Sequence, residues 1–281
     1  MDYLKINFDE LRFGGMKETI DALERAFQKF EIDFYLIGAF ARDIWMNHLD
    51  HLPTRRTTYD IDFSIYIHKI EQFQELKDYL EQVEGFKRTD EPYRLLSPDQ
   101  TIVDLIPFGG VEQNNMVYLE GHPPMDLSVF GNMQVLAHAK TIIANGSEFK
   151  VCTLAGLCIL KLVAGNERAE RFEKDMGDFY YILVNYMEIA GDTLFDVEHE
   201  DLIDEDFEPQ IAAVKILARQ MVPILKESLE LQERIFAIFF KLKEGFDDRE
   251  INEMHELEPQ DKKIRRLKLV SSLNDELKSQ L

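Results

Sequence analysis

Two aspartates stand two residues apart inside a segment that has the pattern of a β-strand. Apolar residues recur at every second position from Ile61 to Ile67, as in a strand with one buried face. Asp60 and Asp62 fall on the opposite face, although aspartate is depleted in strands. Residues two apart on a strand point the same way, with Cα atoms about 6.5–7 Å apart. Two carboxylates this close repel unless a cation lies between them, and Mg²⁺ or Mn²⁺ prefers oxygen ligands. The segment therefore predicts a metal site.

A second candidate element lies about twenty residues upstream. Phe34 to Ile37 is a short apolar run typical of a buried strand, Gly38 ends it, and helical spacing follows from Ala39 to about His48. Free backbone N–H groups and the helix dipole favour an anion at such a turn. This pattern predicts a phosphate-binding turn.

A third strand is predicted downstream, from Thr101 to Pro107, and one aspartate, Asp104, interrupts its apolar run. A carboxylate on a neighbouring strand can complete a two-metal site that clamps the oxygens of a phosphoryl displacement. The alternative is ordinary, because an aspartate near a strand end also caps turns.

Together these segments resemble a known superfamily. Residues 38–43, Gly-Ala-Phe-Ala-Arg-Asp, resemble the Gly-Gly-x-x-Arg-Asp turn of the tRNA nucleotidyltransferases, and residues 59–62, Tyr-Asp-Ile-Asp, resemble their Asp-x-Asp strand. The set is similar to the DNA-polymerase-β-type nucleotidyltransferases, and within them to the AbiEii-type nucleotidyltransferase toxins. Residues 174–178, Lys-Asp-Met-Gly-Asp, match a later helix of that family. The resemblance covers roughly residues 34–183.

The resemblance implies a transferase that moves a nucleoside monophosphate from an NTP to an acceptor hydroxyl, with Mg²⁺ or Mn²⁺ as the cofactor. It implies an RNA or tRNA acceptor, in a toxin–antitoxin setting with an antitoxin protein as partner. One departure is Ala39, which lacks the serine hydroxyl common at this turn. The implied catalytic and metal-binding residues are Asp60, Asp62 and Asp104, and the implied nucleotide-binding residues are Gly38, Ala39, Arg42, Lys161, Arg168, Lys174 and Asp178.

Other interpretations of the same residues stay open. Arg42 with Asp43, and Lys174 with Asp178, have the spacing of ordinary helix ion pairs, and Lys161 could extend its amine from an apolar helix to the surface. The acceptor could be a small molecule or a protein hydroxyl. A non-enzyme alternative is a degenerate fold that binds a nucleotide or a partner protein, which Ala39 would suit.

The charge balance bears on the acceptor. The formal net charge is -21, whereas general nucleic-acid binders are usually basic. Basic residues do cluster at 55–56 and 262–268, and residues 196–208 contain none. An RNA acceptor therefore predicts a continuous basic path, and a small-molecule acceptor predicts a closed acidic pocket.

The predicted fold class is α/β (α+β), a small mixed-sheet nucleotidyltransferase core followed by an all-helical C-terminal domain. We expect the catalytic domain at residues 1–140 and the helical domain at 141–281, with helices over 168–186, 210–221, 223–243 and 261–277. The sequence has no apolar run long enough to span a membrane, and we expect no signal peptide and no disulfide framework from its two cysteines. We expect a cytoplasmic protein.

Overall fold

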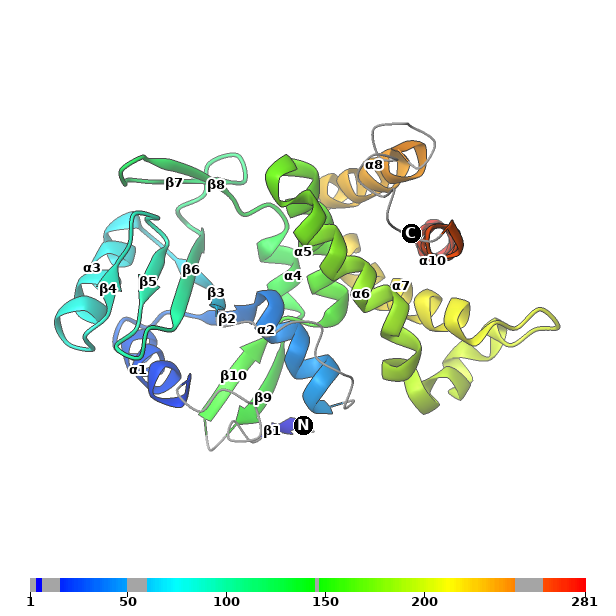
Figure 1. The fold of residues 1–281 in the computed structure, drawn as a ribbon, viewed down its shortest axis with the longest axis horizontal. Coiled ribbons are helices and arrows are strands. Elements are labelled where there is room, and N and C mark those ends of the chain that lie inside the picture. The colour runs from blue at the N-terminus through cyan, green and yellow to red at the C-terminus, as the bar shows by residue number, and fades with distance from the viewer. Residues whose placement is uncertain (1–3, 7–15, 50–59, 145–146, 246–259) are drawn as a thin grey trace. The chain divides into compact units, whose positions relative to one another are not determined.

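The structure is a computed structural model that describes residues 4–6, 16–49, 60–144, 147–245 and 260–281 (Figure 1). Its two compact units are Met1–Thr153 and Leu154–Leu281. The boundary that we predicted at residue 140 falls at the start of strand β9, which belongs to the sheet of the first unit together with β10. These two strands carry the first unit on to Thr153.

The first unit is built on a mixed sheet, which confirms the predicted fold class. Eight strands run in the order β1-β9-β10-β2-β3-β6-β5-β4, and β7 and β8 form a separate hairpin. The central strand β3 pairs antiparallel with β2 and parallel with β6. The strands are β1 Leu4–Ile6, β2 Phe34–Ile37, β3 Asp60–Ile67, β4 Lys87–Arg88, β5 Arg94–Leu96, β6 Ile102–Gly109, β7 Met116–Leu119, β8 Met125–Ser128, β9 Lys140–Ala144 and β10 Ser147–Val151.

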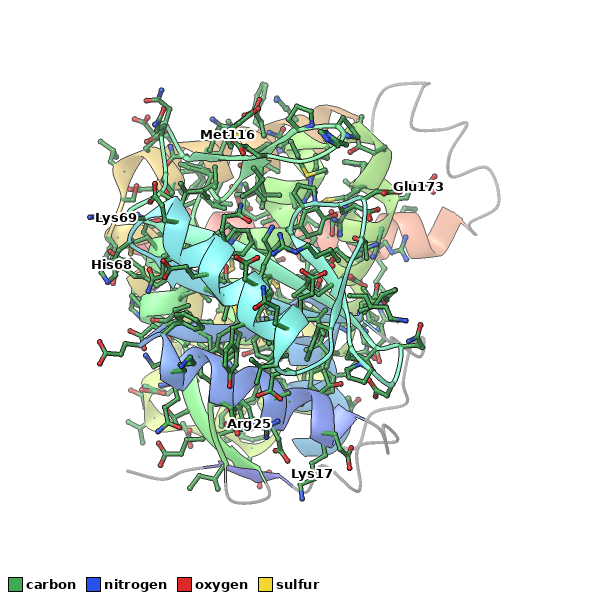
Figure 2. The ribbon with its side chains drawn as sticks, turned by 90° about the vertical axis from the view of Figure 1, so that its left-hand side faces the viewer. Lys17, Arg25, His68, Lys69, Met116 and Glu173 are labelled. Atoms are coloured by element: carbon green, nitrogen blue, oxygen red, sulfur yellow. The ribbon has the colours of Figure 1, made fainter. Side chains whose placement is uncertain are left out.

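Two helices, α1 (Met16–Lys29) and α3 (Ile70–Gln82), lie side by side against one face of this sheet (Figure 2). The apolar residues of β3 at positions 61, 63, 65 and 67 are at most 1% exposed. Phe27 of α1 stacks on Phe34 with ring centroids 4.6 Å apart and meets Phe63 edge-on at 5.7 Å. The alternation seen in the sequence thus reflects a buried face and leaves the aspartates on the other.

The other face of the sheet is more polar. Asn132 begins the short helix α4 (Asn132–Ala137), and its Nδ2 donates a hydrogen bond to the Ser64 hydroxyl at 2.9 Å; both residues are buried. Ser64 follows Asp62 by two residues on β3, so its side chain lies on the same face of the strand as the aspartates. This hydrogen bond therefore lies next to them on that face. Helix α2 (Gly38–Asp43) follows β2, packs on β2 and β3, and continues as a π-helix over Ile44–Leu49.

The second unit is helical over the residues that the structure describes. Helix α5 is apolar around most of its surface and mostly buried, as expected for a central helix. Our expectation that a helix ends before Pro223 is wrong, because α7 runs through that proline and the break falls after Lys226. No described helix is long and apolar enough to cross a bilayer. The main elements are α5 Leu154–Glu167, α6 Phe172–Ala190, α7 Pro209–Lys226, α8 Leu229–Gly245 and α10 Gln260–Gln280, with 3-10 turns η2 Ala169–Arg171, η3 Gly191–Phe195 and η4 Val197–Leu202.

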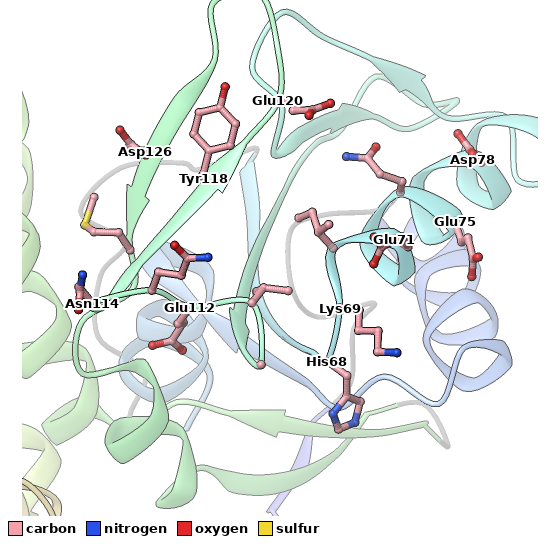
Figure 3. A pocket seen from close by; sticks show the side chains of 16 residues that line it. His68, Lys69, Glu71, Glu75, Asp78, Glu112, Asn114, Tyr118, Glu120 and Asp126 are labelled. Carbon is pink, nitrogen blue, oxygen red and sulfur yellow. The ribbon is translucent and has the colours of Figure 1, made fainter.

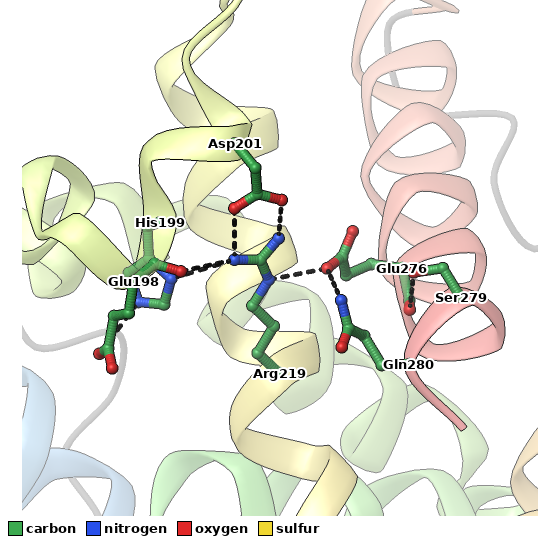
Figure 4. A network of polar contacts seen from close by, with 7 residues as sticks. All are labelled: Glu198, His199, Asp201, Arg219, Glu276, Ser279 and Gln280. Carbon is green, nitrogen blue, oxygen red and sulfur yellow. Dashed lines mark hydrogen bonds and ion pairs between the residues drawn. The ribbon is translucent and has the colours of Figure 1, made fainter.

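Arg219 joins three elements of the helical unit (Figure 4). From α7 its Nε donates to Glu276 of α10 at 2.7 Å, and its Nη1 donates to Asp201 of η4 at 2.9 Å and to the Glu198 carbonyl at 3.0 Å. Its hydrogen bond with Asp201 raises the pKa of Arg219 and lowers the pKa of that carboxyl. The acceptors come from the other two elements, η4 and α10, so we interpret this network as structural.

The buried Lys77 of α3 yields a prediction about pH. It is 4% exposed, donates from Nζ to the Pro92 carbonyl at 2.9 Å and lies 4.7 Å from the Phe73 ring centroid. Burial lowers its pKa to about 8. Between that value and the ordinary lysine pKa near 10.4 the unfolded chain binds more protons, so Lys77 makes stability rise with pH. In the wild type this rise is at most about 1.4 kcal/mol per pH unit, and we expect Lys77→Met to abolish it.

Urea titrations at several values between about pH 7.5 and about pH 10 measure the difference in unfolding free energy between wild type and variant. The exposed Lys17 on α1 provides a control, because Lys17→Met should leave the wild-type slope unchanged. Identical slopes for wild type and Lys77→Met would contradict the prediction.

Candidate functional site

One row of residues crosses the middle of the sheet. In the parallel register of β3 and β6, Asp62 stands beside Asp104. On the far side of β6, Arg94 of β5 is the antiparallel partner of Asp104, and on the other side of β3, Ile37 of β2 is the partner of Asp62. Side chains of register partners point to the same face. The sheet therefore brings Asp104 to Asp62 on the polar face, with Asp60 two residues away on the same strand.

Burial differs among the three carboxylates. Asp104 is 6% exposed, whereas Asp60 and Asp62 are half-buried. Solvent or a ligand can therefore reach the Asp60 and Asp62 carboxylates most directly. Neighbouring strands lie about 4.8 Å apart, so the Asp62 and Asp104 carboxylates are close enough to repel strongly.

Gly38 lies directly against the Asp62 carboxylate. Its φ of +70° is in the left-handed region, and a Cβ placed on it would come 2.0 Å from Asp62 Oδ2. Only glycine fits here, for reasons of both conformation and space. The predicted turn and the predicted carboxylate pair therefore meet at one point, where β2 ends and α2 begins.

Arg94 is a site residue that the sequence patterns did not single out. Its Nε donates to Asp104 Oδ1 at 2.7 Å and its Nη2 to Oδ2 at 2.9 Å, so one guanidinium engages both carboxylate oxygens. This two-bond geometry is the strong form of an arginine–carboxylate pair. The hydrogen bonds that Arg94 donates to Asp104 raise the pKa of Arg94. The side chain of Arg94 is 26% exposed and that of Asp104 is 9% exposed.

The length of the loop between β5 and β6 could have identified Arg94 from the sequence. The segment 97–101 connects β5 to β6 and closes with hydrogen bonds from Ser97 N to the Thr101 carbonyl and from Gln100 N to the Ser97 carbonyl. Counting back through this hairpin pairs Leu96 with Ile102 and Arg94 with Asp104. A register assigned to the hairpin would have found the pair, whereas propensity and periodicity alone do not.

The donor set suits one divalent cation better than two. Asp60 and Asp62 offer two carboxylates on one face, and Mg²⁺ often binds through one or two carboxylates together with substrate phosphates. Asp104 is already engaged by Arg94. Across the described residues, no group of three or more His, Cys, Asp or Glu side chains is arranged to hold a metal ion. The three predicted carboxylates therefore share one face of the sheet, but they are not arranged to coordinate a metal ion together.

The predicted nucleotide residues of the first unit differ in accessibility. Arg42 is 1% exposed, and its Nε and Nη2 donate to Asp43 Oδ1 at 2.8 and 2.5 Å. The ion pair between them therefore lies in the interior rather than at the surface. Ala39 is 7% exposed. Of this turn, only backbone groups at Gly38 and Ala39 remain as candidates for a phosphate contact.

In the helical unit, Lys161 contacts carboxylates. Its Nζ lies 2.8 Å from Asp175 Oδ1 and 3.0 Å from Asp178 Oδ2, and both carboxylate side chains are at most 2% exposed. Lys161 and Asp178, both predicted to bind nucleotide, are therefore together and paired with each other. Lys174 is exposed and Arg168 is half-buried before η2. The role of these residues in nucleotide binding stays a prediction.

An acidic hollow of about 1060 Å³ lies at the opposite end of β3 and β6 (Figure 3). His68 and Gly110, which follow the two strands, belong to its lining. Six residues of extended chain separate His68 from Asp62, about 20 Å. The hollow is therefore not part of the carboxylate row. Its acidic lining residues are Glu71, Glu75, Asp78, Glu112, Glu120 and Asp126.

Among solved structures, the chain is similar to an antigenic nucleotidyltransferase-like protein from Paracoccidioides brasiliensis, with 14% identity, 78% of this chain and 91% of that chain covered, and a TM-score of 0.38. It is also similar to the antibiotic-resistance factor ANT(2'')-Ia, with 12% identity, 73% and 98% covered, and a TM-score of 0.34. No protein-family model and no curated protein matches the sequence. At TM-scores this low the likenesses carry no argument about activity, which rests on the residues of this chain.

The contact between Gly38 and Asp62 predicts a stability effect. We expect Gly38→Ala to cost at least about 2 kcal/mol, because left-handed strain of about 1–2 kcal/mol adds to the clash with the carboxylate. Gly85 is a matched control: its φ is +77°, but the nearest atom to an added Cβ is 3.5 Å away. Gly85→Ala should therefore show the strain alone. Urea unfolding of both variants measures the difference.

A double variant completes this test. In Gly38→Ala with Asp62→Ala, removal of the carboxylate takes away the two closest contacts and leaves the strain and the 2.9 Å contact with the Cβ of residue 62, so the loss should be smaller than the sum of the two single losses. Equal losses in Gly38→Ala and Gly85→Ala would show that the contact has no energetic weight.

Lys161 yields a prediction for the helical unit. Lys161→Met would remove the ammonium that the buried Asp175 and Asp178 share and would leave Arg171, 3.6 Å from Asp175 Oδ2, as the remaining cation beside Asp175, so we expect a loss of up to about 3–5 kcal/mol of stability in the absence of nucleotide. Lys268→Met is the control, because Lys268 and its partner Glu208 have side chains 55% and 57% exposed and an exposed pair contributes at most about 1 kcal/mol. Urea unfolding of wild type and of both variants, all free of nucleotide, measures the two losses. A Lys161→Met variant as stable as wild type would mean that the ammonium is held for a ligand instead.

Proposed function

We propose that the chain is a metal-dependent nucleotidyltransferase that moves a nucleoside monophosphate from an NTP to an acceptor hydroxyl. The observation that carries the proposal is the register of β3 and β6, which sets Asp62 beside Asp104 on the face that also bears Asp60. The approach of Gly38 to the Asp62 carboxylate supports it, since it puts a turn suited to phosphate at the same point.

Each residue has a part in this proposal. Asp60 and Asp62 would hold one Mg²⁺, which when bound neutralises charge on the phosphate oxygens. The backbone at Gly38 and Ala39 would position the triphosphate. Asp104 keeps lone pairs beyond those that Arg94 uses, since an ionised carboxylate offers about four acceptor positions. It can therefore accept the hydrogen bond of an acceptor hydroxyl and orient it.

The reaction is a displacement at the α-phosphorus. The acceptor oxygen forms a bond to that phosphorus, the bond to the bridging oxygen of the β-phosphate breaks, and pyrophosphate leaves with the electron pair. The hydroxyl proton passes to solvent or to Asp104. As in phosphoryl transfer generally, the protein contributes positioning and charge compensation. A contribution of Arg168 or Lys174 to binding the triphosphate stays a prediction.

The distribution of charge favours a small-molecule or protein acceptor over RNA. The net charge is -21. In the basic stretch 262–268, Lys268 bonds to Glu208 at 2.5 and 2.7 Å and Arg265 to Gln210 at 2.8 Å, so these groups already have partners in their own unit. Residues 55–56, where a basic path would begin, lie outside the described part of the chain. An RNA acceptor, a toxin–antitoxin role and an antitoxin partner stay predictions from the resemblance.

A second candidate is a nucleotide-binding protein without transfer activity. Two observations favour it: Arg94 engages both oxygens of Asp104, and Ala39 stands where the resemblance expects a serine or glycine. Calorimetry combined with a pyrophosphate-release assay separates the two candidates, because both predict metal-dependent NTP binding, whereas only the enzyme releases pyrophosphate.

The direct test is Asp60→Asn combined with Asp62→Asn, assayed with each labelled NTP in the presence of candidate acceptors. We expect the rate of label transfer to fall by about two orders of magnitude or more, because the group that compensates transition-state charge is lost. Asp126→Asn, an exposed acid on β8, is the control and should keep the wild-type rate. Undiminished transfer in the double variant would reject the assignment.

A further inference from the structure

The arginine beside Asp104 is more than an incidental surface pair. Both partners lie on paired strands in register, so the backbone holds them opposite each other. Two hydrogen bonds of 2.7 and 2.9 Å join them, and the Asp104 side chain is only 9% exposed. The exposed pair of Arg88 and Glu81, by contrast, has a single contact of 3.0 Å and side chains 36% and 45% exposed. The Arg94 pair is therefore fixed in position.

Arg94 also has neighbours that keep its guanidinium in place. Its centre lies 5.7 Å from the centroid of the Tyr93 ring, and its Nη1 lies 3.8 Å from Glu91 Oε1. An arginine stays protonated at every accessible pH. The positive charge beside Asp104 is thus permanent and needs no ion from solution.

This placement conflicts with a site for two divalent ions. A second ion would need Asp104 oxygens in its coordination sphere, and Arg94 already places a positive charge against both oxygens, which repels a further cation but not a neutral hydroxyl. We infer that Arg94 occupies the place of the second cation: the site binds one divalent ion, through Asp60 and Asp62, and the Arg94 guanidinium supplies the positive charge beside Asp104. Arg94 is then a positioning residue, since it acts on the acceptor through Asp104. The inference rests on the proposed function.

The inference predicts a stoichiometry that can be counted. Mn²⁺ is added to the full chain with a non-hydrolysable NTP analogue, and free Mn²⁺ is measured by electron paramagnetic resonance. Ions that still bind to the Asp60→Asn, Asp62→Asn double variant are subtracted, because an acidic surface binds some cations without a site. We expect one site-bound ion per wild-type chain.

Variants of Arg94 then test the cause. Arg94→Gln frees Asp104 and should raise the count to two, whereas Arg94→Lys keeps a positive charge and should hold it at one. Arg88→Gln, which removes another arginine of the same hairpin, should also leave it at one. A purely structural role for Arg94 would not change the count. Should Arg94→Gln fail to fold, the wild-type count and the count for Arg94→Lys still decide.

The possible outcomes are distinct. Two ions on the wild type, or one ion on a folded Arg94→Gln variant, would overturn the inference and leave the proposed function intact. Absence of both nucleotide-dependent Mn²⁺ binding and analogue binding would overturn the proposed function, and the inference with it. One ion on the wild type and two on Arg94→Gln supports both.

Discussion

The parallel pairing of β3 with β6 is the constraint on which the candidate site depends. Two unit charges about 5 Å apart repel by about 3 kcal/mol at an effective dielectric of about 20, so the pairing brings Asp62 and Asp104 together against their charges. The opposite face decides the register, because a slip by one residue would expose its apolar side chains. Four of these on β3 are at most 1% exposed, and burying each contributes about 1.5–3 kcal/mol. The free energy gained by burying these apolar side chains therefore exceeds the electrostatic repulsion between the two aspartates.

The repulsion that remains is compensated by the groups around the row. Arg94 balances Asp104 from one side, and a divalent ion on Asp60 and Asp62 would balance the other. Gly38 sets the closest approach, since any side chain there would displace the Asp62 carboxylate. In this row of residues the backbone therefore fixes the positions of the three aspartates. The positive charges available around them determine what can bind between them.

The sequence predicted the parts of this row that depend on local pattern. Alternation located β3, and the change from an apolar run to helical spacing at Gly38 located the turn, because both are properties of consecutive residues. Arg94 and Lys161 could not be judged that way, since the partner of a charge lies on another element. The contacts of Lys161 with Asp175 and Asp178 could be found only in the structure, and its predicted contact with phosphate stays a prediction. Pro223 did not end α7, which shows that tertiary packing can override a local breaker.

A guanidinium in the place of a metal ion has chemical consequences for the acceptor. A metal ion can coordinate a hydroxyl oxygen and lower its pKa, whereas Arg94 cannot coordinate it and can only hold the Asp104 carboxylate in position. Nucleophile activation in this site must then come from alignment of the hydroxyl with Asp104 and from charge neutralisation at the phosphate. Such a site suits an acceptor that is bound rigidly by its own contacts. A structured small molecule or an ordered protein side chain meets that requirement better than a flexible RNA end, which agrees with the acidic charge of the chain.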